Sequence, residues 1–259
     1  MHAVTLTAAA SPALRARLRP LTGADEAAVD PGQPEAATSL LRRLVVGGNG
    51  WLDASGVDHL TLADHDRLLA AVFDALYGDQ VEARTICAAC GERLEITLSL
   101  TAFAAALPDV TADIAGPHAD GTFTLPDGRR IRPPSVADLA NAARGGGAAS
   151  LRAACVIAGD PEADPEALDA ALEAAAPALA RDVSATCPHC ATTQPVRFDL
   201  AAFLVAALAR ERPFLLRETH LLARAYGWSH AEILALSRDD RRALARLCEA
   251  ERAASRRAA

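Results

Sequence analysis

The sequence predicts a mostly α protein with small β elements, an α+β fold. Hydrophobic residues make up 51% of the 259 residues, but 62 residues are alanine and only 4% are aromatic. Because alanine is the best helix former and buries little surface, we expect a thin, helical core, and an all-β sandwich is excluded. The strands are predicted by short alternating segments beside two C-x-x-C motifs. These motifs indicate two pseudo-repeated halves joined at a four-cysteine site, followed by a C-terminal helical segment.

Five segments are expected in order. They are a mobile N-terminal arm (1–37), a first half with one C-x-x-C (38–110), a hairpin and helical connector (111–163), a second half with the other C-x-x-C (164–212) and the C-terminal helical segment (213–259). The arm is predicted because prolines recur at positions 12, 20, 31 and 34 without a sustained hydrophobic period.

In the first half, a short helix is expected from Thr38. Thr61 predicts the N-cap of a longer helix that ends near Gly78. Ile96 and Leu98 then alternate with polar residues, which is typical of a half-buried strand, and residues 83–85 are expected to pair with it.

In the connector, residues 122–132 are expected to form a hairpin around a Pro-Asp-Gly turn. Ser135 with Asp138 predicts a helix start. Further helices are expected at 148–158 and 164–180, the second with Asp164 as its cap and Pro165 in its first turn.

An offset of 100 residues aligns the two halves. It places Cys87 on Cys187 and Cys90 on Cys190, and it also matches residue 103 with 203, both phenylalanine. Each half then has the order helix, strand, C-x-x-C, strand, helix. We expect the halves to meet around a pseudo-two-fold axis, with the four cysteines at its centre.

Two C-x-x-C turns can supply four thiolates in a tetrahedron, the arrangement that Zn²⁺ accepts. The sequence therefore predicts one structural zinc per chain, bound by Cys87, Cys90, Cys187 and Cys190 in a zinc-ribbon-like site. Three alternatives remain open: a redox C-x-x-C, structural disulfides, and two separate zinc sites with His189 as an extra ligand. Cys155 and Cys248, in helical segments, are interpreted as small buried apolar residues.

The C-terminal segment is expected to contain three helices, starting at Pro213, Ser229 and Ser237. Trp228 lies at the corner between the first two. It is interpreted either as a plug for that corner or as an anchor for a partner protein.

A helix–turn–helix is the competing interpretation of this segment. Arg238, Arg241, Arg242 and Arg246 could line one face of the third helix, but acidic residues interleave with them. The whole chain carries a net charge of −7, so it lacks the positive field with which proteins gather nucleic acid. A zinc-ribbon regulator that binds nucleic acid is therefore the alternative function, and nucleic acid is not the expected partner.

Catalysis and membrane insertion are not expected. The sequence contains no H-x-x-x-H, P-loop or G-x-S-x-G motif, so we predict that the protein is not an enzyme. It has no apolar run of about 18 residues, and its N-terminus lacks the order of a secretory signal. We expect a soluble protein in the cytoplasm, with no membrane partner.

Three parts of the chain resemble a known family: residues 62–100, the motif CPHC with the following FDLAAFL, and FLLRETHLLARAYGWSHAEILALSRDDRRAL. They are similar to proteins of contractile phage tails and extracellular contractile injection systems, and the last resembles phage baseplate hub assembly proteins. The resemblance covers about residues 40–250 and is most specific from Leu221 to Leu244. It implies a non-enzymatic assembly factor, or chaperone, for a baseplate hub, with a hub or tail protein as partner. Such a protein could also be incorporated into the phage-tail-like particle.

Assembly factors cover an apolar surface of a partner, so exposed helical faces are expected. We hypothesise that residues 200–250 dock on the hub or tail protein. The candidate partner-binding residues are Phe203, Phe214, Leu221, Leu222, Tyr226, Trp228 and Ile233.

Overall fold

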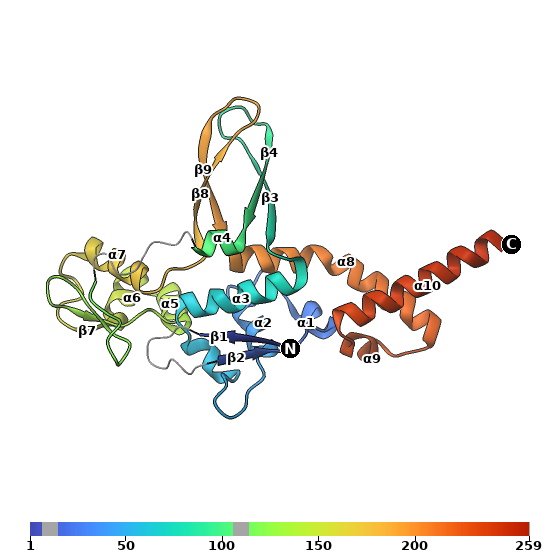
Figure 1. The fold of residues 1–259 in the computed structure, drawn as a ribbon, viewed down its shortest axis with the longest axis horizontal. Helices are drawn as coiled ribbons and strands as arrows, with labels where there is room; N and C mark the ends of the chain where they lie inside the picture. The colour runs from blue at the N-terminus through green and yellow to red at the C-terminus, as the bar shows by residue number, and fades with distance from the viewer. Residues whose placement is uncertain (7–14, 106–113, 259) are drawn as a thin grey trace.

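The computed structural model describes residues 1–6, 15–105 and 114–258, and helices predominate in it (Figure 1). The expected α+β fold, mostly helical with small antiparallel sheets, is confirmed. The helices are α1 (Gly23–Ala28), α2 (Ala36–Leu44), η1 (Ser55–His59), α3 (Leu62–Tyr77), α4 (Leu100–Ala105), α5 (Val136–Arg144), α6 (Gly147–Cys155), α7 (Pro165–Ala175), α8 (Leu200–Tyr226), α9 (His230–Ala235) and α10 (Arg238–Ala258). The strands are β1 (His2–Thr5), β2 (Arg15–Leu18), β3 (Gln80–Ile86), β4 (Arg93–Ser99), β5 (Phe123–Thr124), β6 (Arg130–Ile131), β7 (Val156–Ala158), β8 (Ala180–Thr186) and β9 (Thr193–Asp199).

Two β-hairpins rise side by side from the helices and form what we call the stalk, residues 80–99 and 180–199 (Figure 1). The first hairpin pairs β3 with β4 and the second pairs β8 with β9. Both have seven residue pairs, which run from Gln80 opposite Ser99 and from Ala180 opposite Asp199. The two hairpins therefore have the same register at an offset of 100 residues.

The main core lies below the stalk, between α2, α3 and α8. Thr61 caps α3 by accepting a hydrogen bond from the backbone of Asp64, as predicted. Val81, Leu179 and Phe198, at the base of the stalk, are buried in the same core. The Asp66 carboxylate also accepts a hydrogen bond of 2.6 Å from the backbone of Leu179. The base of each hairpin is thus fixed to the helical body.

The N-terminal region is folded, and the expectation of a mobile arm is wrong for its described part. β1 pairs with β2, α1 follows, and Ala16, Leu18 and Leu21 are buried in the main core. The reason lies in the segment Arg15–Leu18, where arginine alternates with apolar residues, which is the period of a half-buried strand. The prolines around it obscured this short pattern. Residues 7–14 lie outside the described part of the chain.

The contribution of Asp25, in this N-terminal region, to stability can be tested by varying the pH. Its buried carboxylate accepts hydrogen bonds from Arg19, Thr22 and Arg43. Burial raises the pKa of Asp25, but these hydrogen bonds outweigh it and lower the pKa from 3.8 to about 2. Since the folded-state pKa is depressed, Asp25 stabilises the fold above about pH 4, and this stability is lost as the pH falls toward 2.

We therefore expect Asp25→Asn to lower the free energy of unfolding at pH 6 and to flatten its decline between pH 4 and 2. Urea unfolding over that range measures both effects. Asp74→Asn, at an exposed carboxylate on α3, is the control. Equal pH profiles for Asp25→Asn and the wild type would contradict this assignment.

Residues 114–175 pack around a second hydrophobic cluster, and backbone hydrogen bonds from Leu62 to Pro134 and from Val136 to Leu60 join this region to the body. The predicted hairpin at 122–132 is confirmed by β5 and β6, with Phe123 opposite Ile131. The capping box of Ser135 with Asp138 and the cap at Asp164 are also confirmed. Two helices are shorter than expected: α6 ends at Cys155, where β7 begins, and α7 ends at Ala175 before the chain enters β8.

The aligned helices of the two halves have different surroundings. α3 packs in the main core, whereas α7 packs in the cluster of residues 114–175. What the two halves share in the structure is the pair of hairpins and the helix starts at Leu100 and Leu200 that follow them.

The C-terminal segment begins earlier than predicted. α8 runs unbroken from Leu200 to Tyr226 with Pro213 inside it, so the expected helix start at Pro213 is wrong. Proline removes one backbone hydrogen bond and costs a helix interior about 3 kcal/mol. Buried residues on both sides of it, including Leu208 and Leu215, keep the helix continuous. Within the described residues, no helix is long and apolar enough to span a bilayer.

Candidate metal centre

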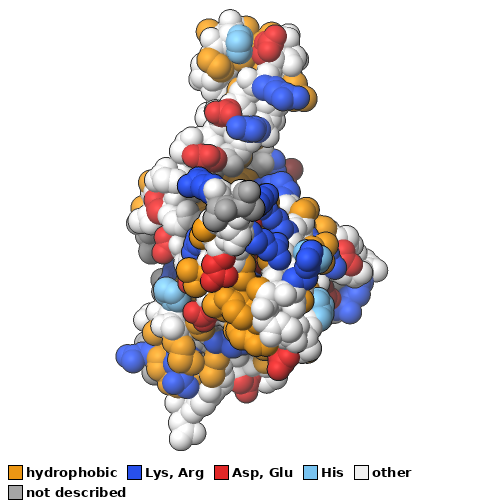
Figure 2. Space-filling model, turned by 90° about the vertical axis from the view of Figure 1, so that its right-hand side faces the viewer, with side chains coloured by type: hydrophobic (Ala, Val, Ile, Leu, Met, Phe, Trp, Pro, Cys, Tyr) orange, Lys and Arg blue, Asp and Glu red, His pale blue; other side chains and the backbone are white. Residues whose placement is uncertain are grey.

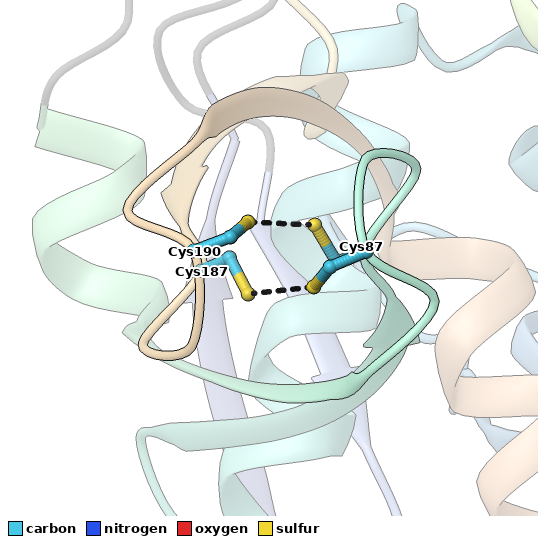
Figure 3. Close-up of side chains that lie close together, drawn as sticks. Cys87, Cys187 and Cys190 are labelled. Carbon is cyan, nitrogen blue, oxygen red and sulfur yellow. Dashed lines mark hydrogen bonds between the residues drawn. The ribbon is translucent and has the colours of Figure 1, made fainter.

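The four predicted cysteines come together at the tip of the stalk (Figure 3). The Sγ atoms of Cys87 and Cys190 lie 3.6 Å apart, and those of Cys90 and Cys187 lie 3.7 Å apart. All four sulfur atoms lie within 4.8 Å of one another. Each of the two short distances joins one hairpin to the other, so a metal ion could be held by thiols from both.

Each C-x-x-C motif forms the turn of its hairpin. In the first, the backbone N–H of Cys87 donates to the carbonyl of Glu92, and that of Gly91 donates to the carbonyl of Cys87. In the second, Cys187 and Thr192 make the equivalent bond of 2.9 Å, and residue 191 donates back to Cys187. The same closed turn therefore presents both cysteines of each motif on one side.

The residue after each motif has a left-handed backbone. Its φ is 75° at Gly91 and 57° at Ala191. This conformation costs a residue with a Cβ about 1–2 kcal/mol, whereas glycine adopts it freely. An added Cβ at Gly91 would meet no atom within 4 Å, so a substitution there tests the backbone alone.

We expect Gly91→Ala to destabilise the stalk by about 1 kcal/mol and Ala191→Gly to stabilise it by up to about 1 kcal/mol. Thermal unfolding of the stalk in the metal-loaded protein measures both changes. Shifts of the same sign in the two variants would contradict the equivalence of the two turns.

One cysteine of each motif is buried and the other is exposed. Cys87 and Cys187 are each 1% exposed and pack with Leu94 and Ala185, whereas Cys90 and Cys190 are exposed. The buried pair faces the apolar interior of the stalk and the other pair faces solvent. An ion between them would therefore close the end of the small apolar cluster.

Gln194 connects the two turns in a way that the sequence analysis missed. Its side chain, on β9, accepts a hydrogen bond from the backbone of Ala88 and donates one to the carbonyl of Ile86. The residue that the 100-residue offset aligns with it is Leu94, which is buried. This difference between otherwise matched strands is the signal that could have identified Gln194.

The thiols influence each other's ionisation. Hydrogen bonds from Thr192 lower the pKa of Cys190 to about 6. A backbone hydrogen bond at Glu92 lowers the pKa of Cys90, but desolvation and the three neighbouring cysteines outweigh it and raise this pKa to about 12. Without a bound ion, the thiolate form of Cys190 is thus stabilised, whereas that of Cys90 is destabilised. A divalent cation removes that conflict because it binds several thiolates together.

The geometry separates the alternatives for these cysteines. All six cysteines are free, and the shortest sulfur separation far exceeds the length of about 2.0 Å of a disulfide bond. A strand, not a helix, follows each motif, unlike in a thioredoxin-type site. His189 is exposed and is not part of the four-sulfur group. Cys155 and Cys248 are buried elsewhere, as expected.

The predicted partner-binding residues divide into two sets. Leu221, Leu222 and Ile233 are buried, so they cannot offer a docking surface, and this part of the prediction is wrong. Leu222 and Ile233 pack with Cys248 in a cluster between α8, α9 and α10. Phe203 is half-buried, with its ring 5.9 Å from those of Phe73 and Phe198.

The remaining three, Phe214, Tyr226 and Trp228, are exposed at 56%, 42% and 37%. Trp228 stacks on Tyr226 with 4.9 Å between ring centroids. It therefore lies at the surface of the corner between α8 and α9, beside Tyr226.

A comparison of this chain with protein-family models, curated proteins and solved structures found no match.

Proposed function

We propose that the stalk tip binds one structural Zn²⁺ per chain. A tetrahedron with Zn–S bonds of about 2.3 Å has sulfur separations of about 3.8 Å. The observed separations of 3.6 and 3.7 Å between the hairpins are close to this value. Four thiolates fill the coordination of zinc, which is typical of a structural site and leaves no position for a substrate. The four-thiol group is the observation that carries this proposal.

The bound zinc would hold the two hairpins together at the end opposite to their base. Isolated two-stranded hairpins are marginally stable in water, and the two sheets of the stalk share no backbone ladder. An ion shared by both tips gives the stalk one arrangement. We further propose that the halves around it arose by duplication, which the matching registers support.

On this basis we propose that the protein is a non-enzymatic assembly factor for the baseplate hub of a contractile tail-like particle. The stalk and the helical segment 200–258 would serve as docking surfaces for a hub or tail protein. The exposed aromatic residues Phe214, Tyr226 and Trp228 support a docking role, because such residues are enriched at binding hot spots. The choice of a baseplate hub rests on the resemblance of residues 221–244. The protein would act in the cytoplasm, where such particles assemble, or remain in the particle.

The ion pairs of α10 favour this proposal over a nucleic-acid-binding regulator. Arg238 and Arg241 are buried and pair with Glu26, while Arg242 pairs with Glu211. A recognition helix needs such arginines free to reach bases and phosphates. Here three of the four candidates are paired with glutamates of the protein itself, and two of them, Arg238 and Arg241, are buried.

Co-purification of the full chain with the proteins encoded by its neighbouring genes tests the assembly role. We expect a tagged wild-type chain to retain a hub or tail protein through washing, and Cys155→Ala to retain it equally. Recovery of no tail or hub component would contradict the assembly role. Binding to heparin and DNA that weakens steeply with salt would support the regulator instead.

A further inference from the structure

The part of the chain from α8 onward differs in charge from the rest. Residues 200–259 contain eleven arginines and seven acidic residues, so they carry a net charge of +4, while the whole chain carries −7. The positive charge of this segment is not spread evenly. Figure 2 looks onto the end of the molecule where α10 terminates and shows arginine side chains gathered there, beside apolar side chains.

The arginines of α10 differ in whether they form ion pairs. Those of its first two turns form ion pairs with glutamates, as described above. Arg252 and Arg256 are further along the same helix, and Arg224 faces them from α8. These three make no ion pair with any residue that the structure describes. Their charges are therefore available to a partner.

These three arginines line one hollow, of about 710 Å³, between α8 and α10. Ser255 and the buried Cys248 also line it, and Glu251 is the acidic residue among its lining residues. A surface hollow with three cations and one anion attracts an acidic ligand, and its concave shape favours a ligand that fills it.

The aromatic pair borders this hollow. Tyr226 hydrogen-bonds to Cys248, a contact that raises the pKa of the tyrosine, and Trp228 stacks on Tyr226. Tyr226 thus reaches the hollow through Cys248, which lines it, and Trp228 lies beside Tyr226. We call Arg224, Tyr226, Trp228, Arg252 and Arg256 the distal face.

We propose that the distal face binds an acidic amphipathic helix of a partner protein. The rings of the aromatic pair would pack against the apolar stripe of that helix. Arg224, Arg252 and Arg256 would form ion pairs with its carboxylates. A protein helix fits better than nucleic acid, because the exposed rings of Tyr226 and Trp228 can pack on an apolar stripe, which duplex DNA does not offer. The combination of arginine and aromatic residues is also typical of protein hot spots. This inference deepens the assembly role and names the partner surface that this role requires.

The test uses the full chain and three fluorescent helical peptides with the same leucine stripe. Their polar positions carry glutamate, glutamine or lysine, and labelled duplex DNA is the fourth probe. We expect fluorescence anisotropy to show tightest binding by the glutamate peptide, with the glutamine peptide about tenfold weaker. Arg252→Glu with Arg256→Glu should weaken the glutamate peptide by about tenfold or more. Trp228→Ala should also weaken it.

The matched control is the double variant Arg67→Glu with Arg144→Glu, which reverses two exposed arginines on α3 and α5. It changes the net charge equally and should alter binding by less than about twofold, since distant surface charges are screened. Unchanged melting of both double variants would show that they are folded. Equal affinity for the three peptides, equal loss in both double variants, or tighter binding of DNA than of any peptide would overturn the proposal.

The co-purification experiment separates this inference from the assembly role. If the distal-face variant still retains a hub or tail protein as well as the wild type does, the inference fails and the assembly role stands. If no such protein is recovered while the glutamate peptide binds as expected, the assembly role fails and the distal face stands.

Discussion

Replacing Cys187 by serine is expected to release the metal and unfold the stalk, while the helical body stays folded. A structural zinc site supplies a folding free energy on the order of 10 kcal/mol in small peptides. Without the ion, the upper parts of the hairpins are joined by the small apolar cluster around Leu94 and Ala185 and by the two hydrogen bonds of Gln194. The base of the stalk belongs to the main core, so unfolding should stop there.

Hydrogen exchange of the purified chain measures this directly. Backbone amides in the upper part of the stalk, residues 84–95 and 184–195, should lose protection in Cys187→Ser, and those of the stalk base, α3 and the first turns of α8 should keep it. Removing the metal from the wild type with a chelator should give the same pattern. Cys155→Ala, at a buried cysteine outside the centre, is the control and should keep both metal and protection. Full stalk protection in metal-free Cys187→Ser would refute the stapling role.

Replacing Arg241 by alanine is expected to destabilise the packing of the C-terminal helices on the N-terminal region by about 3–5 kcal/mol. Arg241 is fully buried and donates to Glu26 at 2.7 Å and to Glu218 at 2.8 Å. Its loss would leave Glu26 with Arg238 alone, at 3.6 Å. A buried carboxylate that loses its partner carries its desolvation cost without compensation.

Arg217→Ala is the matched control, because its ion pair with Glu249 lies at the surface of the same helices. An exposed pair of this kind contributes about 1 kcal/mol or less. Urea unfolding of both variants compares the two costs. Equal losses would show that the buried network does not anchor α10 to α1.

The local signals in the sequence predicted much of the fold. Thr61, Ser135 and Asp164 cap the predicted helices because a cap requires only a side-chain oxygen three residues before an unpaired N–H. The hairpins followed from alternation, and the four-cysteine group followed from two equal motifs at equal positions in their strands. Each cap, each strand and each C-x-x-C motif is complete within a few residues.

The errors arose where distant residues decide the outcome. Pro213 is a helix breaker by local propensity, but buried leucines before and after it keep α8 continuous. Leu222 and Ile233 looked like a docking surface because a helical stripe is the same whether it packs on a partner or on its own chain. Arg241 and Glu26 are 215 residues apart in the sequence, and no local sequence pattern predicts that they pair.

The number of metal ions per chain tests the central claim most directly. Native mass spectrometry of the intact, reduced protein should show one zinc ion per chain, and Cys87→Ser and Cys187→Ser should each abolish it, although the two cysteines belong to different hairpins. Two ions per chain, or a variant that keeps an ion on its unaltered motif, would contradict a centre shared by both hairpins. So would a wild-type chain that contains no zinc and binds none when it is supplied.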